Sequence, residues 1–159
     1  MTDKNKYIEY LVEEYSDMIY RLALSRTKDK DTSKDVYQEV FLRLSKKTPE
    51  FENEDHEKAW IIRVTINCSN NIFENNFFKN TVPIKEELVF ETEPRNEIYY
   101  AVLDLPIKYR TVIHLFYYEG YKTNEISKIL NVNENTVKSQ LSRARERLKS
   151  KIEGGFEDE

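Results

Sequence analysis

The chain has 159 residues and a formal net charge of −4, with 34% charged and 39% apolar residues. This length suits one ordinary domain or two small ones, and no apolar run approaches the ~20 residues that cross a bilayer, so no membrane insertion is expected. The single cysteine excludes an internal disulfide and fits a reducing cytoplasm, while the acidic balance argues against a protein that coats nucleic acid indiscriminately.

The first half of the chain predicts amphipathic helices, because apolar residues recur there at helical spacing. These helices are expected over Tyr7–Thr27, Asp35–Lys47 and Ala59–Phe78. Pro49 should end the second helix, since proline biases the residue before it away from helical angles. The stretch Phe51–Lys58 carries four acidic residues and is predicted to be a loop.

The middle of the chain predicts a linker. Lys79–Arg95 has no helical periodicity and contains two prolines and four glutamates, which favours a flexible acidic tether between two helical domains. A loop packed on one larger domain is the alternative. Beyond it, helices are expected over Asn96–Leu105 and from Pro106 onward, with Gly120 as a left-handed C-cap.

The stretch Thr123–Lys149 predicts two helices with a tight break between them. Thr123 can cap the first helix, Asn131–Asn133 interrupts the periodicity, and Asn133 can cap the second helix. In the second helix a single apolar stripe recurs at i, i+4, i+7 and i+11: Val137, Leu141, Ala144 and Leu148. This arrangement is typical of a helix-turn-helix whose stripe docks the second helix on the domain.

The opposite face of that second helix is basic. Between Asn135 and Lys151 there are six basic side chains and one acidic side chain, a local charge of +5 in an acidic chain. Lys and Arg can bind phosphates and guanine edges, and Ser and Gln can bind other base edges. A solvated face on an ordinary surface helix is the alternative, but the short asparagine-rich break and the short helix before it favour DNA binding.

Three stretches resemble bacterial sigma factors of the extracytoplasmic-function (ECF) group. DVYQEVFLRL at Asp35–Leu44 resembles the second conserved region of that family, and WIIRVTINCSNN at Trp60–Asn71 resembles its promoter-melting region. Leu105–Leu148 resembles its fourth region almost throughout. Because the three stretches occur in the family's order at this length, the chain is identified as a member of the group.

The resemblance implies an all-α fold with two small helical domains, 1–78 and 96–152, the second containing the helix-turn-helix. Residues 79–95 would form the flexible linker, and 153–159 a disordered acidic tail. The first domain would bind the clamp helices of core RNA polymerase and open the minus-ten promoter DNA, and the second would read the minus-thirty-five element. The resemblance further implies a cytoplasmic transcription factor, not an enzyme, with an anti-sigma factor as a common additional partner and no cofactor or metal.

The family's contacts fall on three sets of residues. The polymerase clamp contact falls on Asp35, Gln38, Glu39, Phe41 and Leu42. The minus-ten contacts fall on Asn53, Trp60, Arg63 and Asn67. The minus-thirty-five base readers are Lys138, Ser139, Ser142 and Arg143, with Asn135, Thr136, Arg145 and Arg147 on phosphates. The acidic Phe51–Lys58 stretch departs from the family, whose loop here is usually rich in Arg, Gly and Ser.

Other classes of protein fit the sequence less well. A helix-turn-helix regulator that acts without recruiting polymerase would need a dimerisation surface and a palindromic site. A module whose helix-turn-helix contacts only protein is the third reading. An enzyme is disfavoured because the only two histidines are His56, in the acidic stretch, and His114, expected to pack in a helix. Cys68 is expected to be a small buried apolar residue.

Overall fold

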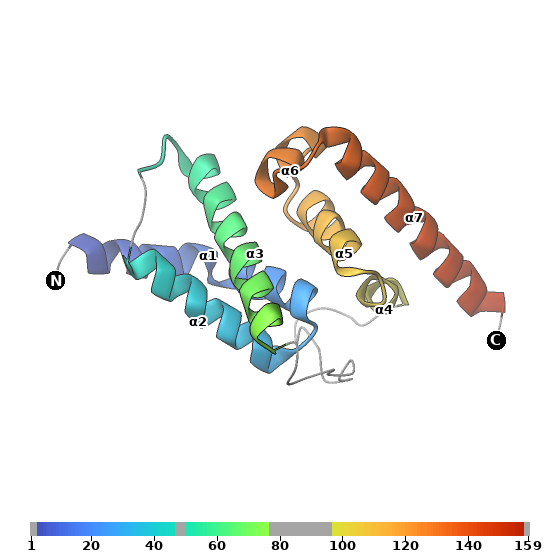
Figure 1. Cartoon of the computed structure of the whole chain (residues 1–159), viewed down its shortest axis with the longest axis horizontal. Helices are drawn as coiled ribbons and strands as arrows, with labels where there is room; N and C mark the ends of the chain where they lie inside the picture. The colour runs from blue at the N-terminus through green and yellow to red at the C-terminus, as the bar shows by residue number, and fades with distance from the viewer. Residues whose placement is uncertain (1–2, 47–49, 77–96, 158–159) are drawn as a thin grey trace. The chain divides into compact units, whose positions relative to one another are not determined.

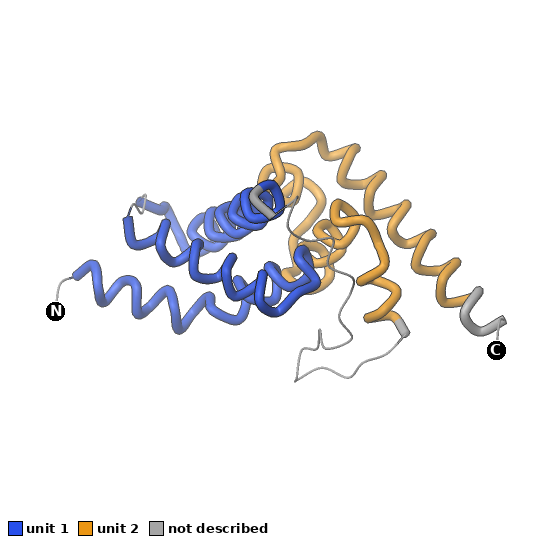
Figure 2. Tube along the Cα trace, turned by 60° about the horizontal axis from the view of Figure 1, so that its bottom comes forward, with its two compact units in different colours: residues 1–85 blue, residues 86–159 orange. Residues whose placement is uncertain are grey.

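The computed structural model describes residues 3–46, 50–76 and 97–157, and all of its regular elements are helices over those ranges. The chain divides into two compact units, residues 1–85 and 86–159, as Figure 2 shows in two colours. This agrees with the expected all-α chain of two small helical parts. The expected linker, 79–95, lies outside the described residues.

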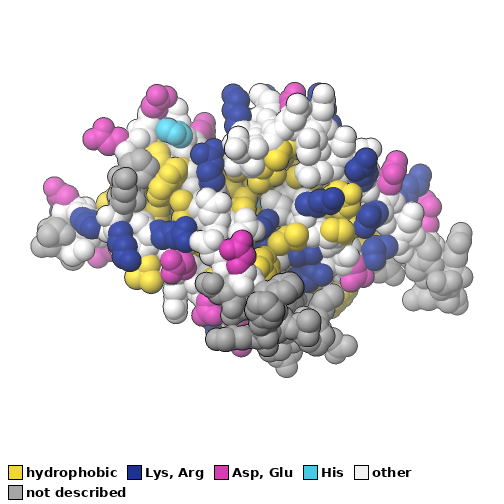
Figure 3. All heavy atoms as spheres, viewed as in Figure 1, with side chains coloured by type: hydrophobic (Ala, Val, Ile, Leu, Met, Phe, Trp, Pro, Cys, Tyr) yellow, Lys and Arg dark blue, Asp and Glu magenta, His cyan; other side chains and the backbone are white. Residues whose placement is uncertain are grey.

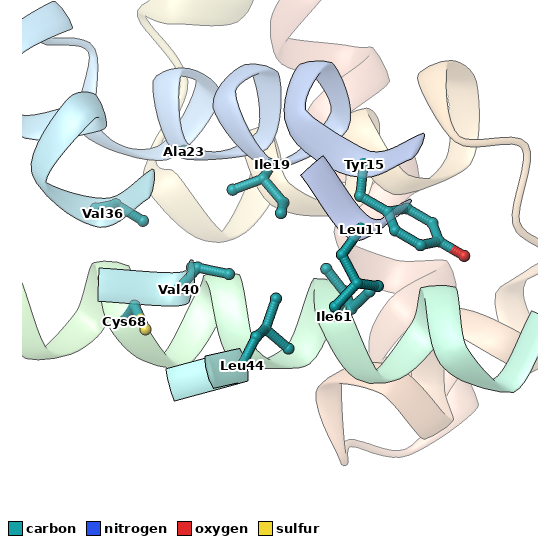
Figure 4. Packing of buried hydrophobic residues seen from close by; sticks show 9 residues of the cluster. All are labelled: Leu11, Tyr15, Ile19, Ala23, Val36, Val40, Leu44, Ile61 and Cys68. Carbon is teal, nitrogen blue, oxygen red and sulfur yellow. The ribbon is translucent and has the colours of Figure 1, made fainter. Parts of the chain in front are cut away.

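The first unit is built from α1 (Asp3–Thr27), α2 (Lys30–Lys46) and α3 (Glu54–Asn76), each of which packs against the other two (Figure 1). Their apolar faces meet in one core, whose side chains point toward one another in Figure 4. The buried members are Leu11, Tyr15, Ile19, Ala23, Val36, Val40, Leu44, Ile61 and Cys68. Burying each large apolar side chain contributes roughly 1.5–3 kcal/mol, which is why a short bundle can stand without a disulfide.

Polar caps place two helix starts earlier than the periodicity predicts. Helix α2 begins at Lys30 because the Asp29 carboxylate accepts the backbone N–H of Thr32 at 3.1 Å. Helix α3 begins at Glu54 because the Asn53 side-chain oxygen accepts the backbone N–H of His56 at 2.8 Å. The prediction of a loop through Lys58 is therefore wrong from Glu54 onward. The acidic residues of that stretch form the first turn of a helix, where the helix dipole favours negative charge.

A buried carboxylate ties the start of α3 to α1. Glu57 is 7% exposed and accepts hydrogen bonds from the hydroxyls of Tyr7, Tyr10 and Tyr15 at 2.7, 3.2 and 2.9 Å. Burial and then the hydrogen bond to Glu57 raise the pKa of the Tyr7 and Tyr15 hydroxyls. The three phenols therefore stay protonated and satisfy the charge that α3 buries in this corner.

The second unit contains α4 (Glu97–Leu103), α5 (Ile107–Ile113), a π-helical turn η1 (His114–Tyr118), α6 (Thr123–Leu130) and α7 (Glu134–Glu157). The predicted C-cap is confirmed in its conformation, since Gly120 has a φ of +74°.

Two features of this unit differ from expectation. The periodicity predicts one uninterrupted helix where the structure has α5 followed by η1. Helix α7 continues to Glu157, so the prediction of a disordered tail from residue 153 is wrong as far as that residue. The acidic composition of the tail suggested disorder, but the helix before it extends into the tail as far as Glu157.

Cys68 should react slowly in the folded protein. Its thiol is fully buried, and this burial raises its pKa to about 11. Because the thiolate is the reactive species, alkylation by iodoacetamide at pH 8 should be far slower in the native chain than in urea, and the native rate should rise toward pH 11. Equal native and denatured rates at pH 8 would contradict the buried position.

Replacing Glu57 should weaken the first unit. Glu57→Ala leaves three phenol hydroxyls without their acceptor, at a cost of about 1–3 kcal/mol in the free energy of unfolding. Trp60 is the only tryptophan and lies in this unit, so its fluorescence reports urea unfolding there. Glu54→Ala, which removes an exposed carboxylate from the same turn, is the control and should change stability by less than about 0.5 kcal/mol.

Candidate nucleic-acid interface

Helices α6 and α7 form a helix-turn-helix whose turn is set by asparagines. Asn131 ends α6 with a left-handed φ of 56°, which an asparagine tolerates better than most residues. The side-chain oxygen of Asn133 then accepts the backbone N–H of Asn135 at 2.8 Å and caps α7, as predicted. At the start of α6 the cap differs from the prediction, because Lys122 and not Thr123 is the N-cap and its backbone N–H donates to Glu125.

The apolar stripe of α7 faces inward. Val137, Leu141 and Ala144 are at most 2% exposed, and Leu148 is half-buried. Burial of this stripe leaves the opposite face of the helix in solvent. Six of the predicted DNA-contacting residues are exposed there: Asn135, Thr136, Lys138, Ser139, Ser142 and Arg143. Figure 3 shows Lys and Arg side chains gathered along α7.

Two of the predicted phosphate contacts lie against aromatic rings of their own unit. The Arg145 Nε donates to the Tyr117 hydroxyl at 2.8 Å, and its guanidinium carbon lies 5.4 Å from the centre of the Phe116 ring. The guanidinium of Arg147 lies 5.1 Å from the ring centre of Tyr109. Both arginines are exposed, but they flank the buried stripe and lie away from the middle of the outer face. Their aliphatic stems therefore cover the edges of the stripe.

The predicted minus-ten residues divide into two groups. Arg63 and Asn67 are exposed one turn apart on α3, with half-buried Trp60 one turn before them. The Trp60 indole packs against the core of the first unit and lies 5.5 Å from the Phe51 ring. Asn53 stands apart from this row, because its side-chain oxygen caps α3.

An open hollow of about 550 Å³ lies where the start of α3 meets α1, at a place where no motif in the sequence indicates one. Its lining combines aromatic rings with carboxylates: Tyr7, Tyr10, Glu50, Phe51, Asn53, Glu54 and Glu57. Negative charge at this point repels phosphate, so this end of α3 suits bases or cationic groups better than a nucleic-acid backbone.

The predicted polymerase-binding residues lie on different sides of α2. Asp35, Gln38 and Leu42 share one face of the helix and are exposed, Leu42 to 54%. Glu39 is half-buried, with its Oε1 3.4 Å from the Nε of Arg43. Phe41, although it belongs to the predicted set, turns toward the core and packs against it. An exposed leucine between polar acceptors is the part of this set that suits a protein partner.

The histidines occupy different environments. His56 is exposed, whereas His114 is 5% exposed, lies over the Tyr118 ring and has its Nε2 3.3 Å from a Glu119 carboxylate oxygen. Within the described ranges, no group of three or more His, Cys, Asp or Glu residues could hold a metal ion. None of the described helices is long and apolar enough to cross a membrane.

Comparison with known proteins finds two sigma-factor regions along the chain, in the order that the sequence predicts. The family described as sigma-70 region 2 matches residues 11–73, and the family described as sigma-70, region 4 matches residues 95–148. The ECF RNA polymerase sigma factor SigM of Bacillus subtilis is 30% identical over 166 aligned positions, covering 96% of this chain and 99% of that protein. SigW of the same organism is 27% identical, covering 89% and 87%.

Two solved structures share the fold. The sigma factor RpoE of Bartonella quintana, solved in complex with the anti-sigma factor NepR, has a TM-score of 0.74 at 20% identity and covers 93% of this chain and 98% of its own. CnrH in complex with the cytosolic domain of CnrY has a TM-score of 0.70 at 19% identity, covering 94% and 90%. With 30% identity over nearly the whole of SigM and both sigma-70 regions in order, the chain belongs to the ECF group of RNA polymerase sigma factors.

Proposed function

We propose that this ECF sigma factor directs core RNA polymerase to its promoters with a division of labour between the two units. The first unit binds the polymerase through α2 and holds opened minus-ten DNA along α3. The second unit places α7 in the major groove of the minus-thirty-five element. The observation that carries the proposal is the outer face of α7, where polar and cationic side chains are exposed on the side of the helix opposite the buried Val137, Leu141 and Ala144.

The minus-thirty-five contact follows from the geometry of a helix in a groove. The major groove admits one helix, and the outer face of that helix meets the base edges. On α7 this face carries Ser139, Ser142 and Arg143, with Lys138 toward one side. A bidentate contact from Arg143 to a guanine would be the most discriminating of these interactions. Asn135 and Thr136, exposed at the start of the helix, suit phosphates.

The polymerase contact rests on the exposed face of α2. Leu42 offers an apolar anchor, and Asp35 and Gln38 offer acceptors on the same face. Acceptors around a buried leucine can bind Arg or Lys of a partner helix while excluding water. Phe41 and Glu39 support this surface from beneath. Phe41 packs against the core, and Glu39 pairs with Arg43.

The minus-ten contact is assigned to the exposed row on α3. Arg63 and Asn67 can hold unpaired bases and their backbone, and Trp60 supports the row from the core side. Asn53 acts first as the cap of α3 and offers only its amide nitrogen to DNA. The acidic residues at this helix start should keep the backbone of the DNA away from it.

An anti-sigma partner and a cytoplasmic location are also part of the proposal. The two structural neighbours were solved with NepR and CnrY, and by analogy an anti-sigma partner would cover the Leu42 face and block polymerase binding. Such a factor works where core polymerase is, in the cytoplasm, and catalyses no reaction itself. A regulator that acts without polymerase has no support, since the chain also carries the region 2 part that such a regulator does not need.

Arg143→Ala should weaken transcription from the cognate promoter. A genomic promoter library transcribed in vitro with bacterial core polymerase and this chain first identifies that promoter. Loss of a bidentate base contact should then cost about 1–3 kcal/mol in promoter binding, with relaxed preference at one base pair. The control is Lys151→Ala, which removes an exposed cation two turns further along α7 and should preserve output. Equal output from Arg143→Ala and the unchanged chain rejects the base contact.

Leu42→Ser should weaken binding to core polymerase. Loss of an apolar anchor at an interface costs about 1–2 kcal/mol, or roughly five- to thirtyfold in Kd, which fluorescence anisotropy of the labelled full chain can measure. Val12→Ser is the matched control, because Val12 is an exposed apolar residue on α1 of the same unit. If both variants bind as tightly as the unchanged chain, the α2 face is not the polymerase contact.

A further inference from the structure

We propose that Tyr117 is a positioning residue for DNA binding: its hydroxyl and ring hold the Arg145 guanidinium at the edge of α7, ready to bind a phosphate beside the minus-thirty-five groove. The inference rests on the proposed function and deepens it. It names a residue outside the helix-turn-helix that sets the orientation of one of its cations.

The contacts between the two side chains are specific. The Arg145 Nε donates to the Tyr117 hydroxyl at 2.8 Å, and the guanidinium carbon lies 5.7 Å from the centre of the same ring. The centre of the Phe116 ring lies 4.9 Å from that of Tyr117 and 5.4 Å from the same guanidinium carbon. Arg145 is nevertheless exposed, so these rings fix its position without taking it out of reach of a ligand.

The π-helical turn η1 decides where Tyr117 lies. The backbone N–H of Glu119 donates to the carbonyl of His114 at 3.1 Å, five residues back, which marks one extra residue in the turn. The side chains of the same two residues meet at 3.3 Å and bracket that turn. One residue of an α-helix corresponds to about 100° of rotation, so an uninterrupted helix would aim Tyr117 elsewhere. Such π turns are frequent at functional sites.

Arg145 lies on the edge of α7 that borders the proposed base-reading face. Lys138, Ser142, Arg145 and Lys149 follow one another at intervals of four, three and four residues, which puts them along one edge of the helix. When a helix lies in a major groove, its outer face meets the bases and its edges meet the phosphate walls. Arg147 lies on the other edge, over the ring of Tyr109.

Fixing the guanidinium in advance favours binding. A long side chain loses rotamer freedom when it binds a phosphate, and an arginine already held by a hydrogen bond and two rings has lost part of that freedom before DNA arrives. A charge-assisted contact to phosphate then costs less ordering. Tyr117 therefore acts on DNA through Arg145, and its effect should vanish when Arg145 is replaced.

A double-mutant cycle tests this dependence. Holoenzyme of core polymerase and the full chain is bound to a linear duplex of the promoter recovered from the library, and the Kd is measured over a range of salt. Arg145→Gln should lower the slope of log K against log salt by about one, as loss of one phosphate contact does. Tyr117→Phe, which removes only the hydroxyl, should weaken binding on the order of fivefold.

In the Arg145→Gln background, Tyr117→Phe should have no further effect. A merely structural Tyr117 would give the same loss in both backgrounds, and that result overturns the inference, as does an unchanged Kd for Tyr117→Phe alone. Arg143→Ala distinguishes failure of this inference from failure of the proposed minus-thirty-five contact. If it weakens binding while Tyr117→Phe does not, this inference alone fails, and if it also leaves binding unchanged, the proposed minus-thirty-five contact fails with it.

Discussion

Burial of one apolar stripe on α7 is the constraint on which the second unit depends. Val137, Leu141 and Ala144 are out of solvent, and a helix is too rigid to turn one side chain without turning its whole face. Fixing the stripe therefore fixes which residues face outward. The asparagine turn before α7 sets where this face begins, so the cap and the buried stripe together determine which cations are exposed.

The same constraint acts on α2 in the first unit. On α2 the burial of Val36, Val40 and Leu44 leaves Leu42 on the opposite side, where it has no place in the core. A sigma factor needs such a surface because its function is to be held by a much larger enzyme. The Glu57 cluster anchors α1 to the start of α3 and keeps this small bundle in one arrangement.

Much of this could be predicted from the sequence, and the exceptions have physical reasons. The stripe and turn of the helix-turn-helix were predictable because periodicity and capping residues agree there. The start of α3 was not, since acidic residues suggest both a solvated loop and the first turn of a helix, and only the Asn53 cap decides between them. The π turn lies at the end of its helix, so too few residues follow it for a shift of one residue to show in the apolar periodicity. The Tyr117 partner of Arg145 lies 28 positions away in sequence, and neither periodicity nor capping residues indicate a contact at that separation.

The most direct test of the account identifies which molecule contacts the outer face of α7 when the holoenzyme is bound to its promoter. A photo-crosslinking amino acid at position 139, in the holoenzyme on its promoter, should crosslink to the duplex at the minus-thirty-five element. The same group at exposed position 153, about 21 Å further along the helix, should not. Crosslinking of position 139 to polymerase or to the chain itself, with no DNA adduct, would contradict the assignment of the outer face of α7 to promoter recognition.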